Sequence, residues 1–174
     1  MERIEKQPVD LNGKAILVTG AAGFIGSNLC KRLLRETTES VIVGIDCMTD
    51  YNPIELKEWR LKDIQDTFEQ DGMDRKNQWI FIKGDIADQA LINKLFNQYA
   101  FAVVVNLAAQ AGVRYSITNP EAYLHSNLIG FFNILEACRN DKNLEHLVYA
   151  SSSSVYGGNT KVPFSTDDKV DNPV

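Results

Sequence analysis

Short apolar runs alternate with segments of helical periodicity along most of this chain, and this alternation is the feature that most restricts its fold. Five runs are expected to be buried strands: residues 14–19, 41–46, 79–82, 101–107 and 144–150. Strands covered on both faces are continuously apolar, as these are, and their alternation with helices predicts a parallel sheet. Right-handed crossovers then favour an α/β, doubly wound sheet with strand order 3-2-1-4-5.

Helical periodicity is found between the expected strands. The predicted helices span residues 23–35, residues 53–70, a segment that Asp88 caps, and residues 119–139. In the second of them, the spacing predicts five inward-facing apolar side chains: Leu56, Trp59, Leu61, Ile64 and Phe68. The tail, residues 157–174, is polar and rich in turn-forming residues.

Composition excludes several classes of function. The 174 residues carry a formal net charge of −5, which argues against nucleic acid as a partner. No apolar run approaches the roughly 18 residues needed to span a membrane, and the charged N-terminus does not resemble a signal peptide. The three cysteines, Cys30, Cys47 and Cys138, show no metal-ligand spacing. We therefore expect a cytoplasmic protein with free thiols, no metal and no membrane partner.

Glycines follow the first predicted strand in the run Thr-Gly-Ala-Ala-Gly-Phe-Ile-Gly. Gly20 can form the tight turn out of the strand, and Gly23 lets the backbone approach a pyrophosphate. Gly26 permits close packing of the helix on the sheet. Because the next helix would direct its positive dipole end at the same point, the motif predicts dinucleotide binding rather than merely a tight connection.

Two acidic residues end the next strands. Asp46 lies about 20 residues after Gly26, where a carboxylate binds the adenosine ribose hydroxyls and disfavours a 2′-phosphate. This predicts NAD rather than NADP; the alternative is a solvated aspartate at a strand end. Asp85 could accept a hydrogen bond from the adenine amino group, or it could be a turn residue that caps the next helix.

Two further segments follow the fourth and fifth strands. Small residues precede Arg114 in residues 106–114 and leave room for a ligand. Arg114 could pair with a phosphate or a carboxylate, or it could be a solvated surface residue. Four serines at 151–154 could orient a substrate hydroxyl, or they could form an ordinary serine-rich loop.

Together these motifs carry a resemblance. The runs TGAAGFIGSNL, VGID, GDI, NLAAQAGVRYS, HSNLIGFFNILEA and YASSSSVYGG resemble the extended short-chain dehydrogenase/reductase family, in its NAD-dependent epimerase/dehydratase branch. Within this branch, the AAQAGVRYS and DYNPIELK segments are most similar to the UDP-glucuronate 4-epimerases.

The resemblance implies an NAD-binding Rossmann domain over residues 14–174, preceded by an N-terminal extension over residues 1–13. A smaller C-terminal sugar-nucleotide domain is expected to be absent, which makes the chain a truncated N-terminal fragment. The cofactor contacts that the resemblance implies are Gly20, Gly23, Phe24, Ile25, Gly26, Asp46, Asp85, Ile86, Leu107, Ala108, Ala109, Asn127 and Ser151. Ser152 is the implied catalytic residue, which would bond the reacting sugar hydroxyl, with Ser153 and Arg114 as further substrate contacts.

The implied reaction is reversible oxidation at C4 of a UDP-sugar, with UDP-glucuronate and UDP-galacturonate as the expected pair. The family uses a tyrosine base followed four residues later by a lysine that lowers the tyrosine pKa. None of the six tyrosines here has such a lysine, so this chain is expected to be inactive alone. The longer parent is expected to be a homodimer built on the helix at residues 119–139.

Two other functions stay open. The first is the function of a dehydratase or reductase of the same family. Related dehydratases, however, carry Asp-Glu where this chain has Ser153 and Ser154. Neither serine is a useful proton shuttle at neutral pH, which favours epimerisation. The other is a non-catalytic NAD-binding module, which the missing Tyr/Lys pair would also fit.

Overall fold

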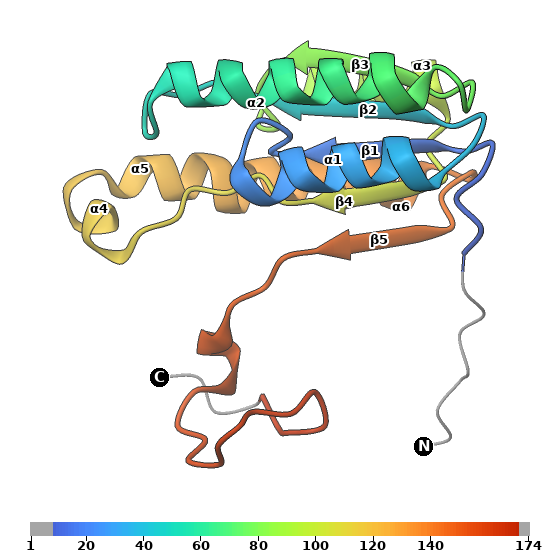
Figure 1. Cartoon of the computed structure of the whole chain (residues 1–174). Helices are drawn as coiled ribbons and strands as arrows, with labels where there is room; N and C mark the ends of the chain where they lie inside the picture. Colours follow the sequence, from blue (N-terminus) through green and yellow to red (C-terminus); the bar gives the residue numbers. More distant parts are fainter. Residues whose placement is uncertain (1–8, 171–174) are drawn as a thin grey trace.

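The computed structural model describes residues 9–170, which form a five-stranded parallel sheet in the order β3-β2-β1-β4-β5 (Figure 1). The strands are β1 (Ala15–Thr19), β2 (Val41–Asp46), β3 (Gln78–Lys83), β4 (Val103–Asn106) and β5 (His146–Tyr149). In the centre of the sheet, Leu17 lies opposite Val43 on one side and Val104 on the other. The predicted fold class and strand order are confirmed.

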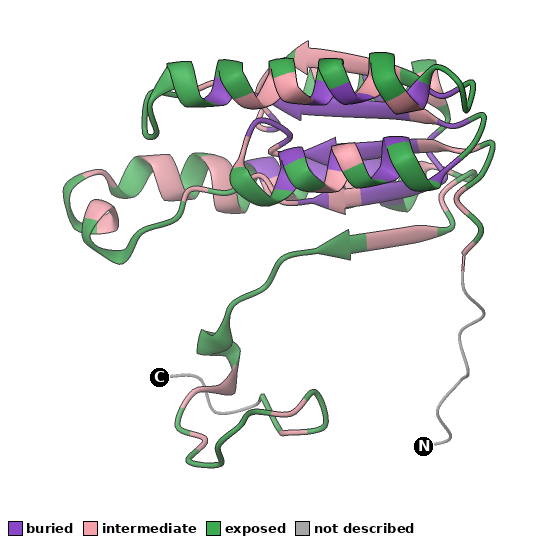
Figure 2. Ribbon diagram, in the orientation of Figure 1, coloured by how far each residue is buried: buried purple, intermediate pink, exposed green. Residues whose placement is uncertain are grey.

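Helices cover both faces of the sheet. They include α1 (Phe24–Glu36), α2 (Ile54–Thr67), α3 (Gln89–Tyr99) and α6 (Phe131–Asn140). Along β1 the side chains alternate between two cores: Ile16 and Val18 pack toward α1 and α2, whereas Leu17 packs toward α3 and α6. All three are fully buried, and Figure 2 shows burial concentrated in the central strands. This two-sided burial explains why the middle positions of the central strands are apolar on both faces.

The predicted helix at residues 53–70 forms, but the prediction of its inward-facing side chains is partly wrong. Ile64 is buried, whereas Leu56 and Trp59 are 40% and 61% exposed. Lys57 is buried instead. A π-helical segment, η1 (Phe68–Gly72), continues α2 beyond its last α-helical residue.

The predicted helix at residues 119–139 is found as three successive segments. They are α5 (Pro120–Tyr123), the π-helical η2 (Leu124–Gly130) and α6. Asn119 caps the first of these by accepting a hydrogen bond from the Ala122 amide. The short helix α4 (Val113–Thr118), which no sequence signal predicted, precedes them.

The region after β5 leaves the sheet and carries the short 3-10 helix η3 (Ser153–Tyr156) (Figures 1 and 2). Its aromatic rings at Tyr156 and Phe164 stack with centroids 4.6 Å apart. Of the predicted N-terminal extension, residues 1–8 lie outside the described part, while Leu11 packs against the core under α1. No helix within residues 9–170 is long and apolar enough to cross a membrane.

A buried asparagine joins the end of α1 to the start of β3. The Asn77 amide donates to the carbonyl oxygens of Leu34 (3.0 Å) and Thr37 (2.9 Å). Its Oδ1 accepts a hydrogen bond from the Ser40 amide at 2.9 Å. Since buried backbone groups need partners, this one side chain satisfies two carbonyls at the end of α1 and one amide just before β2.

We predict that Asn77→Ala lowers the free energy of unfolding by about 3 kcal/mol, because three buried backbone groups lose their partners. Urea denaturation of the purified chain measures this loss. Asn97→Ala, at an exposed position of α3, is the matched control and should change stability by less than about 0.5 kcal/mol. Equal stability of the two variants would contradict the assigned role.

Candidate functional site

The glycine loop between β1 and α1 lies at the carboxyl edge of the sheet. Gly20 has φ +70°, and its amide donates to the Ile45 carbonyl at 2.8 Å. A Cβ at Gly20 would lie 2.9 Å from the Ala108 amide nitrogen, and one at Gly26 would lie 2.2 Å from the Gly20 carbonyl oxygen. The loop is therefore held closely against both neighbouring strand ends, and Gly23 is the N-cap residue of α1.

Asp46, at the end of β2, is buried and fixed from several sides. Its Oδ2 accepts a hydrogen bond from the Ala22 amide of the glycine loop at 3.1 Å. Its Oδ1 accepts from the Met48 amide at 2.9 Å and from Lys57 Nζ at 3.3 Å. The alternative of a solvated strand-end aspartate is therefore wrong, since only 8% of Asp46 is exposed.

Helix α2 adds two cations to this site that the sequence analysis missed. Lys57 forms a buried ion pair with Asp46. Arg60 donates to the Ala22 carbonyl at 3.3 Å, and its guanidinium carbon lies 6.0 Å from the centre of the Phe24 ring. The segment DYNPIELK carries a family resemblance, but no spacing rule within it identifies Lys57 as a site residue.

The loop after β4 is fixed by polar side chains from two other elements. The Thr19 hydroxyl donates to Asn106 Oδ1 at 2.7 Å. Its oxygen, Oγ1, also accepts from the Leu107 and Ala108 amides at 3.1 and 3.0 Å. Asn127, on η2, donates to the Gln110 carbonyl at 2.9 Å and accepts from the Gln110 amide at 2.8 Å. Both contacts hold the backbone that borders the glycine loop.

Asp85 takes part in a turn after β3. Its Oδ1 accepts from the Ala87 amide at 2.8 Å, and its Oδ2 lies 2.9 Å from Nε2 of His125. The cap of α3 is Asp88, as predicted, whose Oδ1 accepts from the Leu91 amide at 3.0 Å. Asp85 is thus a turn residue, but it does not cap the next helix.

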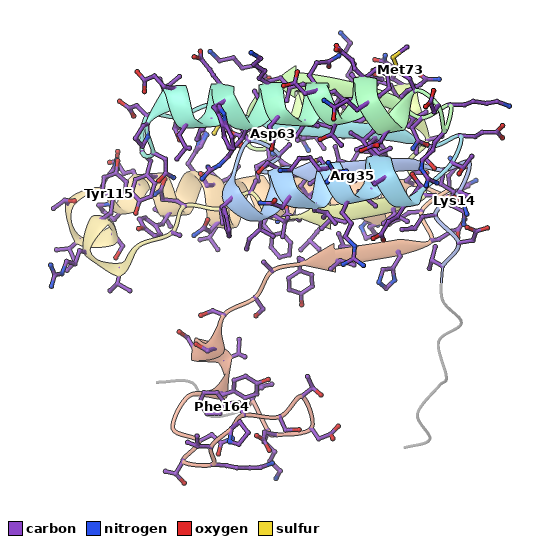
Figure 3. The ribbon with its side chains drawn as sticks, in the orientation of Figure 1. Lys14, Arg35, Asp63, Met73, Tyr115 and Phe164 are labelled. Carbon is purple, nitrogen blue, oxygen red and sulfur yellow. The ribbon has the colours of Figure 1, made fainter. Side chains whose placement is uncertain are left out.

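Three tyrosines pack where the loop after β2 meets the loop after β4. The Tyr115 ring centre lies 5.0 Å from that of Tyr51 and 6.3 Å from that of Tyr123. Figure 3 shows Tyr115 at the end of the molecule opposite Lys14, which is the end to which the strands point. Desolvation and the neighbouring phenols raise the pKa of Tyr123, whose hydroxyl donates to the Ala111 and Gly112 carbonyls. These contacts fix the Tyr123 side chain against the loop after β4.

Most of the predicted cofactor residues line one open cleft. Those in its wall are Gly20, Gly23, Asp46, Asp85, Ile86, Leu107, Ala108 and Ala109. Lys57, Tyr51 and Ser126 share this wall and were not predicted. The cleft therefore brings together residues from the loops after four strands.

The remaining predicted residues lie around this cleft. Asn127, Ser151 and Ser152 line an adjoining cleft that shares the backbone of residues 107–110. Phe24 and Ile25 are exposed in the first turn of α1, and Gly26 packs beneath the loop. Ser153 and Arg114 are exposed and lie outside the residues that line the two clefts. Ser152 Oγ caps η3 by accepting from the Ser154 amide at 3.2 Å.

This sheet order, with a glycine loop after β1 and a carboxylate after β2, defines the Rossmann class of α/β folds. A family model described as GDP-mannose 4,6 dehydratase matches residues 17–173. The chain therefore belongs to this NAD-dependent epimerase/dehydratase family.

Several relatives of known sequence or structure are similar to it. Protein CapI of Staphylococcus aureus is 48% identical over 159 residues, which is 91% of this chain and 44% of CapI. UDP-glucuronate 4-epimerase 2 of Arabidopsis thaliana is 45% identical over 162 residues, 93% of this chain and 35% of that protein. The chain thus spans between about a third and a half of the length of these relatives.

A solved structure shares the fold over most of the chain. It is a UDP-glucuronic acid 4-epimerase mutant from Bacillus cereus in complex with UDP-4-deoxy-4-fluoro-glucuronic acid and NAD. The TM-score is 0.73 at 34% identity, over 92% of this chain and 46% of that one.

We predict that Lys57→Met lowers the free energy of unfolding by about 2–3 kcal/mol, because it leaves the Asp46 carboxylate buried without a counter-charge. The double variant Asp46→Asn/Lys57→Met should be more stable than Lys57→Met alone, since it removes the unpaired charge. Urea denaturation of the two single variants and the double variant measures the coupling. If the stability losses of the two single variants simply add up in the double variant, the Asp46–Lys57 pair contributes nothing to the free energy of unfolding.

Proposed function

We propose that this chain binds NAD in the cleft at the carboxyl edge of its sheet. The observation that carries the proposal is the contact between the glycine loop and Asp46, through the Ala22 amide. Through this contact the loop that would bind a pyrophosphate, at the start of α1, lies beside the carboxylate that would bind the adenosine ribose. Membership of an NAD-dependent family and the NAD in the Bacillus cereus epimerase structure support it.

The residues that would hold NAD fit its parts. The glycine loop and the first amides of α1 suit the pyrophosphate, and the Asp46 carboxylate suits the ribose hydroxyls. Asp85 and Ile86 would bind the adenine, while residues 107–109 would border the path to the nicotinamide. Asn127 would act by fixing the Gln110 backbone, given its two hydrogen bonds there.

We further propose that the parent reaction is 4-epimerisation of a nucleotide sugar, with UDP-glucuronate and UDP-galacturonate as the pair. Bound NAD would supply the acceptor and donor of hydride. Ser152, which lines the adjoining cleft, would hold the sugar hydroxyl whose proton is transferred. The relatives named as UDP-glucuronate 4-epimerases support this assignment of substrate.

Dimerisation of the parent protein is part of the same proposal. Leu124, Leu128 and Phe132, along η2 and α6, are more than half exposed. An apolar stripe of this kind favours a helix-to-helix interface with a second copy.

We predict that calorimetry detects NAD binding to the chain and a clear preference for NAD over NADP. In Asp46→Asn the ratio of the two affinities should fall by about tenfold, because the carboxylate no longer repels a 2′-phosphate and Lys57 becomes free to attract it. Asp74→Asn, at an exposed position before β3, should keep the original ratio. Failure of the unaltered chain to bind NAD would overturn the proposed function.

We also predict that these 174 residues bind NAD without interconverting UDP-glucuronate and UDP-galacturonate. The physical reason is that no tyrosine here has a lysine four residues later to lower its pKa. Chromatography of the UDP-sugars after incubation with NAD tests this. Turnover would mean that another group acts as the base.

A further inference from the structure

One ionisable residue beside the cofactor cleft, His125, has no part in the proposed function, although it contacts Asp85. His125 Nε2 lies 2.9 Å from Asp85 Oδ2, with side chains 54% and 39% exposed. Asp85 comes from the turn after β3, whereas His125 comes from the π-helical segment η2, 40 residues later in the chain. The pair therefore links two elements that border the cleft from different sides.

The two residues line a hollow that opens beside the cofactor cleft. Asp85 and Ser126 belong to the walls of both spaces, and Ser126 directly follows His125. The other Asp85 oxygen, Oδ1, is already held by the Ala87 amide. The carboxylate is thus fixed in orientation by one backbone group and one histidine.

Several other ionisable groups face this hollow from the neighbouring elements. They are Cys47, Asp50 and Tyr51 from the loop after β2, Tyr115 from α4, and Glu121 from α5. Carboxyl, thiol and phenol groups ordinarily keep their charge between pH 5.5 and 7.5, whereas a histidine ordinarily changes its charge in this range. Among the side chains that line this hollow, His125 is the one whose residue type ordinarily changes its charge in that range.

We infer that His125 is a positioning residue for adenine recognition, and that its charge sets how strongly Asp85 accepts the adenine amino group. The inference rests on the proposed binding of NAD, with Asp85 as the adenine contact. A neutral imidazole orients the carboxylate by one hydrogen bond and leaves its full negative charge for the ligand. An imidazolium pairs with that charge and competes with the adenine amino group for it.

The expected size of the effect is modest because the pair is half exposed. Exposed ion pairs contribute energies that correspond to about a 1.5- to 5-fold change in an equilibrium constant. The preference for an adenine over a base without the amino group should therefore fall about threefold from pH 7.5 to pH 5.5.

The test compares NAD with its hypoxanthine analogue, which has an oxygen in place of the adenine amino group. Affinities are measured by calorimetry at pH 5.5 and 7.5 for the unaltered chain, His125→Gln and His146→Gln. Glutamine keeps an N–H donor for Asp85 but cannot take a charge. His146, at the amino end of β5, is the only other histidine of the chain and is the matched control.

We expect the ratio of the two affinities to be larger at pH 7.5 in the unaltered chain and in His146→Gln, and to be independent of pH in His125→Gln. A pH dependence that persists in His125→Gln, or is missing from the unaltered chain, would overturn the role of His125 and leave NAD binding intact. Absence of binding at both pH values would instead overturn the proposed function, and this inference with it.

A second measurement needs no variant. Because binding of the adenine would favour neutral His125, NAD binding near pH 6 should release protons, whereas binding of the hypoxanthine analogue should release fewer. Calorimetry in two buffers of different ionisation enthalpy counts these protons. Equal proton release with the two dinucleotides would also contradict the inference.

Discussion

The close approach of the glycine loop to the neighbouring strand ends is the constraint on which the rest of the cleft depends. Gly20 lies so near the Ala108 amide that a Cβ would be 2.9 Å from it, and the Gly20 carbonyl lies against Gly26 at the start of α1. Since neither contact leaves room for a side chain, β1, β4 and α1 can converge here only with glycine at both positions. The Ala22 amide then reaches Asp46 at the end of β2, which joins a third strand to the same point.

Polar side chains around this convergence act first on the protein's own backbone. Thr19 binds the amides of Leu107 and Ala108, and Asn127 binds both backbone groups of Gln110. Fixing these loops before a ligand arrives lowers the entropy that binding must overcome. A residue implied as a cofactor contact by resemblance can therefore contribute by holding a loop in place, as the two Asn127 hydrogen bonds do.

The parts of the structure that could be predicted follow from repeating patterns. Five apolar runs separated by helical segments are enough to predict the strand order. The glycine spacing is enough to locate the loop after β1. The face of α2 could not be predicted in the same way. Its periodicity treats Trp59 as a core residue, yet Trp59 is exposed while the charged Lys57 is buried against Asp46. An ion pair between a strand end and a helix has no signature in the periodicity of either element.

The contacts made by η2 escaped prediction for a related reason. The π-helical stretch Leu124–Gly130 changes which side chains face the sheet, and an α-helical spacing rule cannot anticipate that change. His125 meets Asp85 there, and a Cβ at Gly130 would lie 2.6 Å from Cγ1 of Ile86, in the same turn after β3. The turn and η2 are thus packed together through Gly130 and through the contact between His125 and Asp85. A change in the charge of His125 would act on a carboxylate that this packing has already placed at the edge of the cleft.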